Sequence, residues 1–285
     1  MRANTRRSVA CALVALSAGF VIAPASGVSR DDAAALTNLA GSLVVAAQRL
    51  GALETPANLG HGARMVFVGD SLGGDVARGL IPVATARGAR VVLKTVPGCS
   101  TIAGLPLTHD GTLIPWGPTC LDNLLGSWPA EVAATPADAV VWLSSFDGAS
   151  RMIDGVLADT ATPEGRARIA ALTIEMSDAI APPGSGRRVV LLLPAPDAPS
   201  PLHGEPDRRS AIDVERHRAI LHLVVESDPT RFSMLKLDQF LCPRGVPCPA
   251  EPVPGIAPRG ADGGHITPEG AAWLAPQVLD ALGVT

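Results

Sequence analysis

Five short apolar stretches alternate with longer segments of helical periodicity, and this alternation restricts the possible folds more than any other feature. Each stretch has four to seven residues, as strands that are buried on both faces do. Parallel strands joined by helices need right-handed crossovers, which place helices on both faces of the sheet. The sequence therefore predicts an α/β fold, a doubly wound parallel sheet of about five strands in a flavodoxin-like order. The strands are expected at residues 65–68, 90–96, 139–144, 188–193 and 232–237.

The segments between and around these strands predict helices and Pro- and Gly-rich loops. Helices are expected at residues 31–50, 72–87, 121–134, 163–181, 208–226 and 268–282. Neither a repeat nor a linker divides the strand-helix region. We expect an N-terminal helix and linker at residues 26–61 and one domain at residues 62–285. The long loops at 195–207 and 242–264 lie at the sheet's edge, where long loops are more often functional than idle.

The first residues have the pattern of an export signal. Arg2, Arg6 and Arg7 precede an apolar run at residues 9–23, and Ala23-Pro24-Ala25 fits a small-x-small cleavage site. We expect a signal peptide at residues 1–25 and a secreted or envelope-associated protein. An uncleaved anchor is the alternative, although the run is short and rich in alanine.

Charge and hydropathy exclude some partners. The formal net charge is −4 and no basic run is present, which argues against nucleic acid. No second stretch is long and apolar enough to span a membrane, so no stable span is expected after signal cleavage. We expect a monomer.

The mature chain keeps an even number of cysteines, which suits disulfides in an exported protein. Cys99, Cys120, Cys242 and Cys248 allow three pairings, and the sequence-local one, Cys99 with Cys120 and Cys242 with Cys248, is our choice. A zinc site would need two close pairs with ligand spacing, which Cys99 and Cys120 do not supply.

Ser71 lies where the first strand turns into the first helix of the sheet. A serine at such a turn holds its hydroxyl at the sheet edge, with its N–H beside the positive end of a helix. This position suits a nucleophile that passes through an oxyanion. The alternative is that Ser71 only caps the helix.

His265 and Asp262 can supply the base and its partner. A serine hydroxyl needs a base to take its proton, and the base needs a group that fixes its tautomer. Asp262 precedes His265 by three residues across two glycines, so one turn can bring the carboxylate to Nδ1. The segment can equally be a tight turn before a helix that Thr267 caps.

Ligands of such sheets bind beyond the carboxyl ends of the strands. Residues that follow the first and third strands are therefore candidate substrate contacts. They are Asp70, Ser144, Ser145, Phe146 and Asp147.

Gly69-Asp70-Ser71-Leu72 near the start, together with Asp262-x-x-His265 before a final helix, resembles the SGNH/GDSL superfamily of serine esterases and acyltransferases. The resemblance covers about residues 64–282. It implies that Ser71 is the nucleophile, His265 the base and Asp262 the orienting acid. It further implies oxyanion donors in the N–H groups of Ser71 and Gly98, and no metal or organic cofactor. The chain is also similar to the SGNH domains attached to bacterial membrane acyltransferases that modify surface glycans.

One position departs from the family pattern. The third block normally reads Gly-x-Asn-Asp, and its Asn side chain is an oxyanion donor; Phe146 occupies that place here. Loss of one such donor typically lowers the rate by about 10²–10³-fold.

Two function hypotheses follow. The first is an exported serine esterase or O-acyltransferase that acts on small O-acyl esters, such as acetyl groups, of envelope carbohydrate or lipid through an acyl-serine. The second is a weak or inactive SGNH-fold domain that binds glycan as an accessory. A metal enzyme is disfavoured because His265 and Asp262 lack further ligands at sensible spacing.

Overall fold

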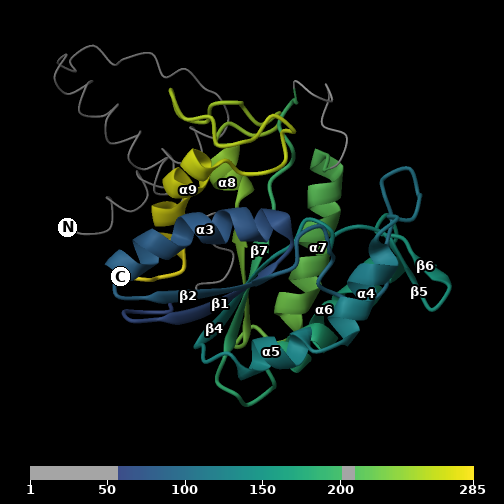
Figure 1. Ribbon diagram of the computed structural model, residues 1–285. Coiled ribbons are helices and arrows are strands. Elements are labelled where there is room, and N and C mark those ends of the chain that lie inside the picture. The colour runs from purple at the N-terminus through teal and green to yellow at the C-terminus, as the bar shows by residue number, and fades with distance from the viewer. Residues whose placement is uncertain (1–56, 201–208) are drawn as a thin grey trace, which may run out of the picture. The chain divides into compact units, whose positions relative to one another are not determined.

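The computed structural model describes residues 57–200 and 209–285, so the expected signal peptide and the expected helix at 31–50 lie outside the described residues. A sheet of five parallel strands is the centre of the described domain, in the order β2-β1-β4-β7-β8 (Figure 1). Counted along the chain this is the order 2-1-3-4-5, which confirms the predicted flavodoxin-like sheet. The strands are β1 Arg64–Gly69, β2 Arg90–Thr95, β4 Ala139–Leu143, β7 Arg188–Leu193 and β8 Phe232–Lys236.

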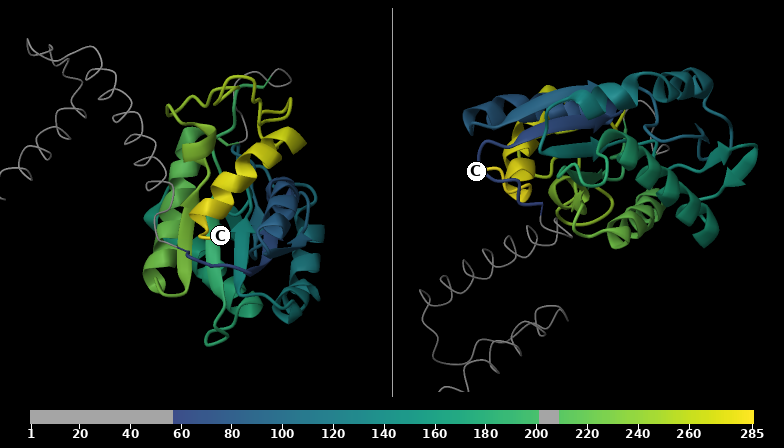
Figure 2. Two further views of the ribbon diagram at one scale, coloured as in Figure 1. Left: turned by 90° about the vertical axis from the view of Figure 1, so that its left-hand side faces the viewer. Right: turned by 90° about the horizontal axis from the view of Figure 1, so that it is seen from below.

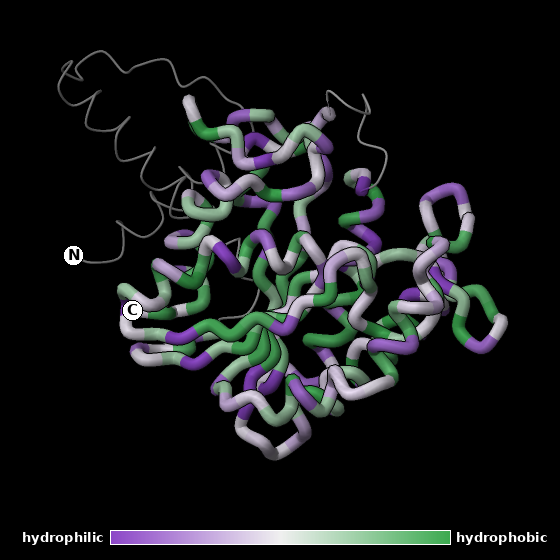
Figure 3. The backbone as a smooth tube through the Cα atoms, in the orientation of Figure 1, coloured by the Kyte–Doolittle hydropathy of each residue, from purple (hydrophilic) through white to green (hydrophobic). Residues whose placement is uncertain are grey.

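Helices cover both faces of this sheet (Figures 1 and 2). Successive strand residues point to opposite faces, so Met65 and Phe67 pack with α3 and α9, whereas Val66 and Val68 pack with α4 to α7. The middle parts of the strands are correspondingly hydrophobic (Figure 3). The helices are α3 Ser71–Ala86, α4 Gly117–Leu125, α5 Trp128–Ala134, α6 Pro163–Ile180, α7 Ala211–Ser227, the short α8 Asp238–Leu241 and α9 Pro268–Ala281.

Local sequence explains where the long helices begin. Thr162 and Thr267 each accept a hydrogen bond from a backbone N–H of the first turn, and a proline follows each of them. Ser210 and Asp213 form a reciprocal capping box at the start of α7. Within the described residues, no helix combines the length and the apolar character that crossing a bilayer requires.

Two features differ from the sequence-based expectation. The helix expected at 121–134 is divided into α4 and α5, because Pro129 in the first turn of α5 has no N–H to continue the preceding helix. A second sheet of three short antiparallel strands, in the order β3-β5-β6, was not expected. Strands of two or three residues are too short to show a period. They are β3 Leu105–Pro106, β5 Arg151–Ile153 and β6 Val156–Ala158.

Helices α3 and α9 come into very close contact at Gly79. A Cβ on Gly79 would lie 2.4 Å from the carbonyl carbon of Ala271. The two helices lie side by side on the same face of the sheet (Figure 1).

We expect Gly79→Ala to lower the free energy of unfolding by about 1–3 kcal/mol, because the new methyl group overlaps the α9 backbone. In an isolated helix the same change would be stabilising. Gly117→Ala is the matched control, since its Cβ would meet its nearest atom at 3.5 Å. Chemical unfolding of the three proteins measures both effects, and a Gly79→Ala protein more stable than wild type would contradict the close contact.

Candidate active site

Two glycines allow β1 to turn sharply into α3 at Ser71. Gly69 has φ +148°, and a Cβ there would lie 1.7 Å from the carbonyl oxygen of Leu143 at the end of β4. A Cβ on Gly73 would lie 2.4 Å from the same oxygen. Only glycine fits such close approaches, so the first turn of α3 lies directly against the end of β4.

The carboxylate of Asp70 fixes this turn. It is fully buried, and one oxygen accepts hydrogen bonds from the N–H groups of Leu72 and Gly73 at 2.9 and 3.3 Å. The other oxygen accepts from the N–H of Ser145 at 2.7 Å and from its hydroxyl. Burial raises the pKa of Asp70, and the hydrogen bonds from Ser145 oppose that shift. Asp70 thus joins β1, α3 and the loop after β4.

Ser71, His265 and Asp262 form a continuous chain of hydrogen bonds. Ser71 Oγ lies 2.9 Å from His265 Nε2, and His265 Nδ1 contacts Asp262 Oδ2. Burial alone would raise the pKa of Asp262, but hydrogen bonds from the ring and the N–H of His265 and from the N–H of Gly264 outweigh it and lower this pKa to about 2. The side chain of His265 is 45% exposed, so a ligand can reach the pair from solvent.

The four-residue turn that carries Asp262 and His265 depends on its glycines. Asp262 Oδ1 accepts from the N–H groups of Gly264 and His265, both at 3.1 Å, which is a local Asx-type turn. Gly263 has φ +72°, and a Cβ there would lie 2.1 Å from the carbonyl oxygen of Ala198 in the loop after β7. The N–H of Ala198 donates to Gly263 O at 3.0 Å, which holds the two loops together.

A buried arginine holds the same turn from inside. Arg259 donates to Gly263 O at 3.1 Å, to Gly264 O at 3.4 Å and to Pro196 O at 2.6 Å. Burial lowers the pKa of Arg259 to about 10. Its planar fork spreads five donors over three nitrogens and so reaches carbonyls of two loops, whereas a lysine has its three donors on a single nitrogen.

Arg209 adds a second cation at this turn. It is paired with the buried Asp197 and contacts Gly264 O at 3.4 Å. The loop after β7 and the two guanidinium groups therefore fix the position of His265 relative to the sheet.

The loop after β2 brings Gly98 to the same edge of the sheet. Val96 N donates to Gly69 O at 2.8 Å, so this loop runs beside the residues that precede Ser71. Gly98 has φ +76°, which favours glycine. Among the described residues no group accepts a hydrogen bond from the N–H of Gly98 or of Ser71. Both residues are partly exposed.

The loops after β2 and β4 are joined by a buried ionic network. Asp147 accepts from Ser100 Oγ at 2.7 Å, from Thr101 N at 2.8 Å and from Trp142 Nε1 at 2.9 Å. Arg151, which is fully buried, donates to Ser100 Oγ at 3.0 Å and to the carbonyl of Asp147 at 3.2 Å. Burial lowers the pKa of Arg151 to about 10, and the charge of Asp147 opposes this shift.

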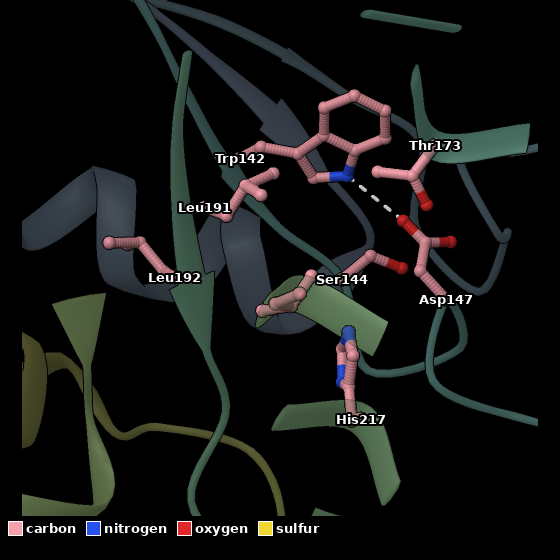
Figure 4. A pocket seen from close by; sticks show the side chains of 8 residues that line it. Trp142, Ser144, Asp147, Thr173, Leu191, Leu192 and His217 are labelled. Atoms are coloured by element: carbon pink, nitrogen blue, oxygen red, sulfur yellow. Dashed lines mark hydrogen bonds between the residues drawn. The ribbon is translucent and has the colours of Figure 1, made fainter. Parts of the chain in front are cut away.

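A small cavity lies beneath this network. Its volume is about 10 Å³, the space of one water molecule, so it cannot admit a substrate. Ser144 and His217 face each other across it, next to Asp147 (Figure 4). His217 packs so tightly on Gly148 that a Cβ there would lie 2.4 Å from its ring. Burial lowers the pKa of His217 to about 4; Arg209 and Arg151 add to this shift and Asp147 opposes it.

The structure separates the expected substrate-contact residues into two groups. Ser145 and Phe146 are partly exposed. Asp70, Ser144 and Asp147 are buried, with exposed fractions of 0%, 2% and 5%, and are not available to a substrate. The expectation for these three is corrected, because residues that directly follow a strand also hold its neighbouring loops together.

The cysteines pair as expected from the sequence, Cys99 with Cys120 and Cys242 with Cys248. In the described part of the chain, no group of three or more His, Cys, Asp or Glu side chains is arranged to hold a metal ion.

Sequence reasoning missed the arginines that organise the site. Arg259, Arg209 and Arg151 belong to no motif that the sequence shows. Trp116 was also missed: its Nε1 donates to Gly98 O at 2.7 Å.

We expect His217 to make folding stability depend on pH. The unfolded histidine titrates near 6.5 and the folded one near 4, so stability is fully present above about pH 6.5 and falls as pH drops towards 4. Between pH 6.5 and pH 4 the free energy of unfolding of His217→Gln should therefore fall by about 3 kcal/mol less than that of wild type. Urea unfolding at pH 8, where the histidine is neutral in both states, gives the packing cost of the substitution separately. An unchanged slope between pH 6.5 and pH 4 would refute the assignment.

Comparison with known proteins found similar solved structures. The fold resembles the periplasmic domain of a lipopolysaccharide acetyltransferase from Salmonella ser. Paratyphi A, with a TM-score of 0.50 and 13% identity over 78% of this chain and 84% of that one. A lipase/acylhydrolase from Enterococcus faecalis matches with a TM-score of 0.47 and 16% identity over 78% of this chain and 95% of that one. The likeness to the acetyltransferase domain concerns the fold alone. No curated protein sequence matches this chain.

The family model gives the more specific result. The model of the SGNH domain that occurs fused to AT3 domains matches residues 44–280, which include Ser71, Asp262 and His265. This match spans most of the chain and agrees with the motifs and with the sheet order. The chain belongs to the SGNH family.

Proposed function

We propose that this chain is an extracytoplasmic serine esterase or O-acyltransferase, which acts on small O-acyl esters, such as acetyl esters, of envelope carbohydrate or lipid. The observation that carries the proposal is the hydrogen-bonded chain from Ser71 Oγ through His265 to Asp262. Two disulfides and the signal-like N-terminus support a location outside the cytoplasm.

The reaction has two acyl-transfer steps. Ser71 Oγ attacks the ester carbonyl carbon while His265 Nε2 takes the hydroxyl proton. The resulting oxyanion is bound by the N–H groups of Ser71 and Gly98. Collapse of the intermediate breaks the bond to the alcohol, which receives the proton from His265, and leaves an acyl-serine. Water or a sugar hydroxyl then attacks the acyl-serine by the same route in reverse.

Asp262 suits the role of orienting acid. Its pKa of about 2 keeps the carboxylate ionised at neutral pH. It therefore stabilises the positive charge that His265 acquires in each step and holds Nδ1 as the donor.

We expect Ser71→Ala to lower kcat/KM on short acyl esters by at least about 10³-fold. A serine-directed phosphonate should label wild type, with the added mass on Ser71, and leave the variant unmodified. Ser127→Ala, at an exposed serine before α5, is the control and should keep wild-type turnover. Equal turnover by wild type and Ser71→Ala would sink the proposal.

Arg259 is a positioning residue in this scheme. Arg259 reaches Gly263 O and Pro196 O with two different nitrogens. A lysine keeps the charge but has a single nitrogen, so Arg259→Lys should lower kcat by about 10–100-fold and leave KM within about twofold. Arg187→Lys is the matched control. Arg187 also donates to three carbonyl oxygens, but it precedes β7 and so lies at the N-terminal ends of the strands, away from the site. If Arg259→Lys and Arg187→Lys lose kcat equally, Arg259 serves stability alone. The same holds if the loss of kcat in Arg259→Lys is matched by a fall in its unfolding midpoint.

A second function, glycan binding without turnover, is favoured by Phe146. This residue stands where the family has an Asn donor, and its carbonyl instead accepts from Arg151 at 2.8 Å. If acetylated glycan binds equally to wild type and Ser71→Ala, and neither turns it over, the accessory role replaces the enzymatic one.

A further inference from the structure

Trp116 is an exposed aromatic residue with a fixed orientation. It precedes α4 and is 51% exposed. Its Nε1 donates a hydrogen bond to Gly98 O at 2.7 Å, so the ring is not free to rotate away. Trp128 and Trp142 are both buried. A large aromatic ring that is held in place yet left half in solvent presents a ready-made contact surface.

The ring lies against the loop that supplies a proposed oxyanion donor. The indole nitrogen would be 3.5 Å from a Cβ on Gly98, so the ring edge covers that residue. The disulfide between Cys99 and Cys120 joins the same loop to α4. Val96 N donates to Gly69 O at 2.8 Å, which holds this loop beside the turn that leads into Ser71. Trp116 therefore lies against the loop that runs beside the turn into Ser71.

The exposed ring of Trp116 is chemically suited to contact with a sugar ring. A flat aromatic face packs against the C–H face of a pyranose, whose hydroxyl groups stay at the rim and need polar partners. Thr119, one turn further along α4, is exposed and offers a hydroxyl. A flexible acyl chain would gain less here, because the half-open face leaves much of the chain in water.

We propose that Trp116 is the platform on which the pyranose ring of an acylated sugar stacks while its ester reaches Ser71. This inference rests on the proposed function and assigns the alcohol side of the substrate to the wall formed by the loop after β2 and α4.

The test compares a ring-bearing ester with acyclic esters. Initial rates are measured for methyl 6-O-acetyl-glucopyranoside, ethyl acetate and ethyl butyrate with wild type, Trp116→Ala, Trp116→Phe and the control Trp273→Phe on α9. In Trp116→Ala the ratio of kcat/KM for the sugar ester to that for ethyl acetate should fall by about tenfold, mainly through KM. Trp116→Phe keeps a ring face and should keep at least a third of the ratio, while Trp273→Phe should leave it unchanged.

Two kinetic outcomes would overturn the inference and leave the proposed function standing. Equal loss on the sugar ester and on ethyl acetate in Trp116→Ala would mean that the ring only holds Gly98 in place. A selective loss on ethyl butyrate would assign the ring to the acyl chain instead.

A binding measurement tests the inference if no ester is turned over. That kinetic result would remove the proposed function. Methyl glucopyranoside is titrated into wild type, Trp116→Phe and Trp273→Phe, and tryptophan emission is followed. A saturable change that is lost in Trp116→Phe and kept in Trp273→Phe supports the platform without any catalysis. The absence of a saturable change in wild type overturns it.

Discussion

The rest of the site depends on the hydrogen bonds that the buried carboxylate of Asp70 accepts. A charged group without solvent needs full hydrogen bonding, and Asp70 obtains it from two N–H groups of α3 and from the N–H and hydroxyl of Ser145. Those donors come from two elements far apart in the sequence. Satisfying the carboxylate therefore fixes α3 against β4 and directs the N-terminus of α3, with Ser71, towards the open edge of the sheet.

The second half of the site is held within itself only by the hydrogen bonds of Asp262 to Gly264 and His265. The turn from Asp262 to His265 contains two glycines and would be flexible alone. Its position relative to the sheet comes from outside, through Arg259, Arg209 and the loop after β7. Side chains on loops can be placed accurately only when their supports are themselves fixed. Here planar guanidinium groups supply that support by bridging carbonyl oxygens.

The position of Phe146 is understandable from the residues around it. Asp147 and Arg151 bind the loops after β2 and β4 from inside the fold, and this role does not depend on the side chain at 146. The backbone of Phe146 joins the network through its carbonyl oxygen, which accepts from Arg151. The segment therefore keeps its structural role while lacking the side-chain donor. In the proposed reaction the oxyanion is left to the N–H groups of Ser71 and Gly98.

The sequence by itself determined the five strands, because they depend on short-range periodicity, and the alternation of strands and helices then indicated the sheet order. It also indicated that Asp262 can reach His265, because the two lie within a single turn. It also indicated both disulfides. Only the tertiary structure decided that Ser71 meets His265 across 194 residues, that Asp70, Ser144 and Asp147 are buried, and that Trp116 lies against Gly98. These facts depend on how aperiodic loops pack at one edge of the sheet, where each carbonyl and charge must find a partner from a distant part of the chain.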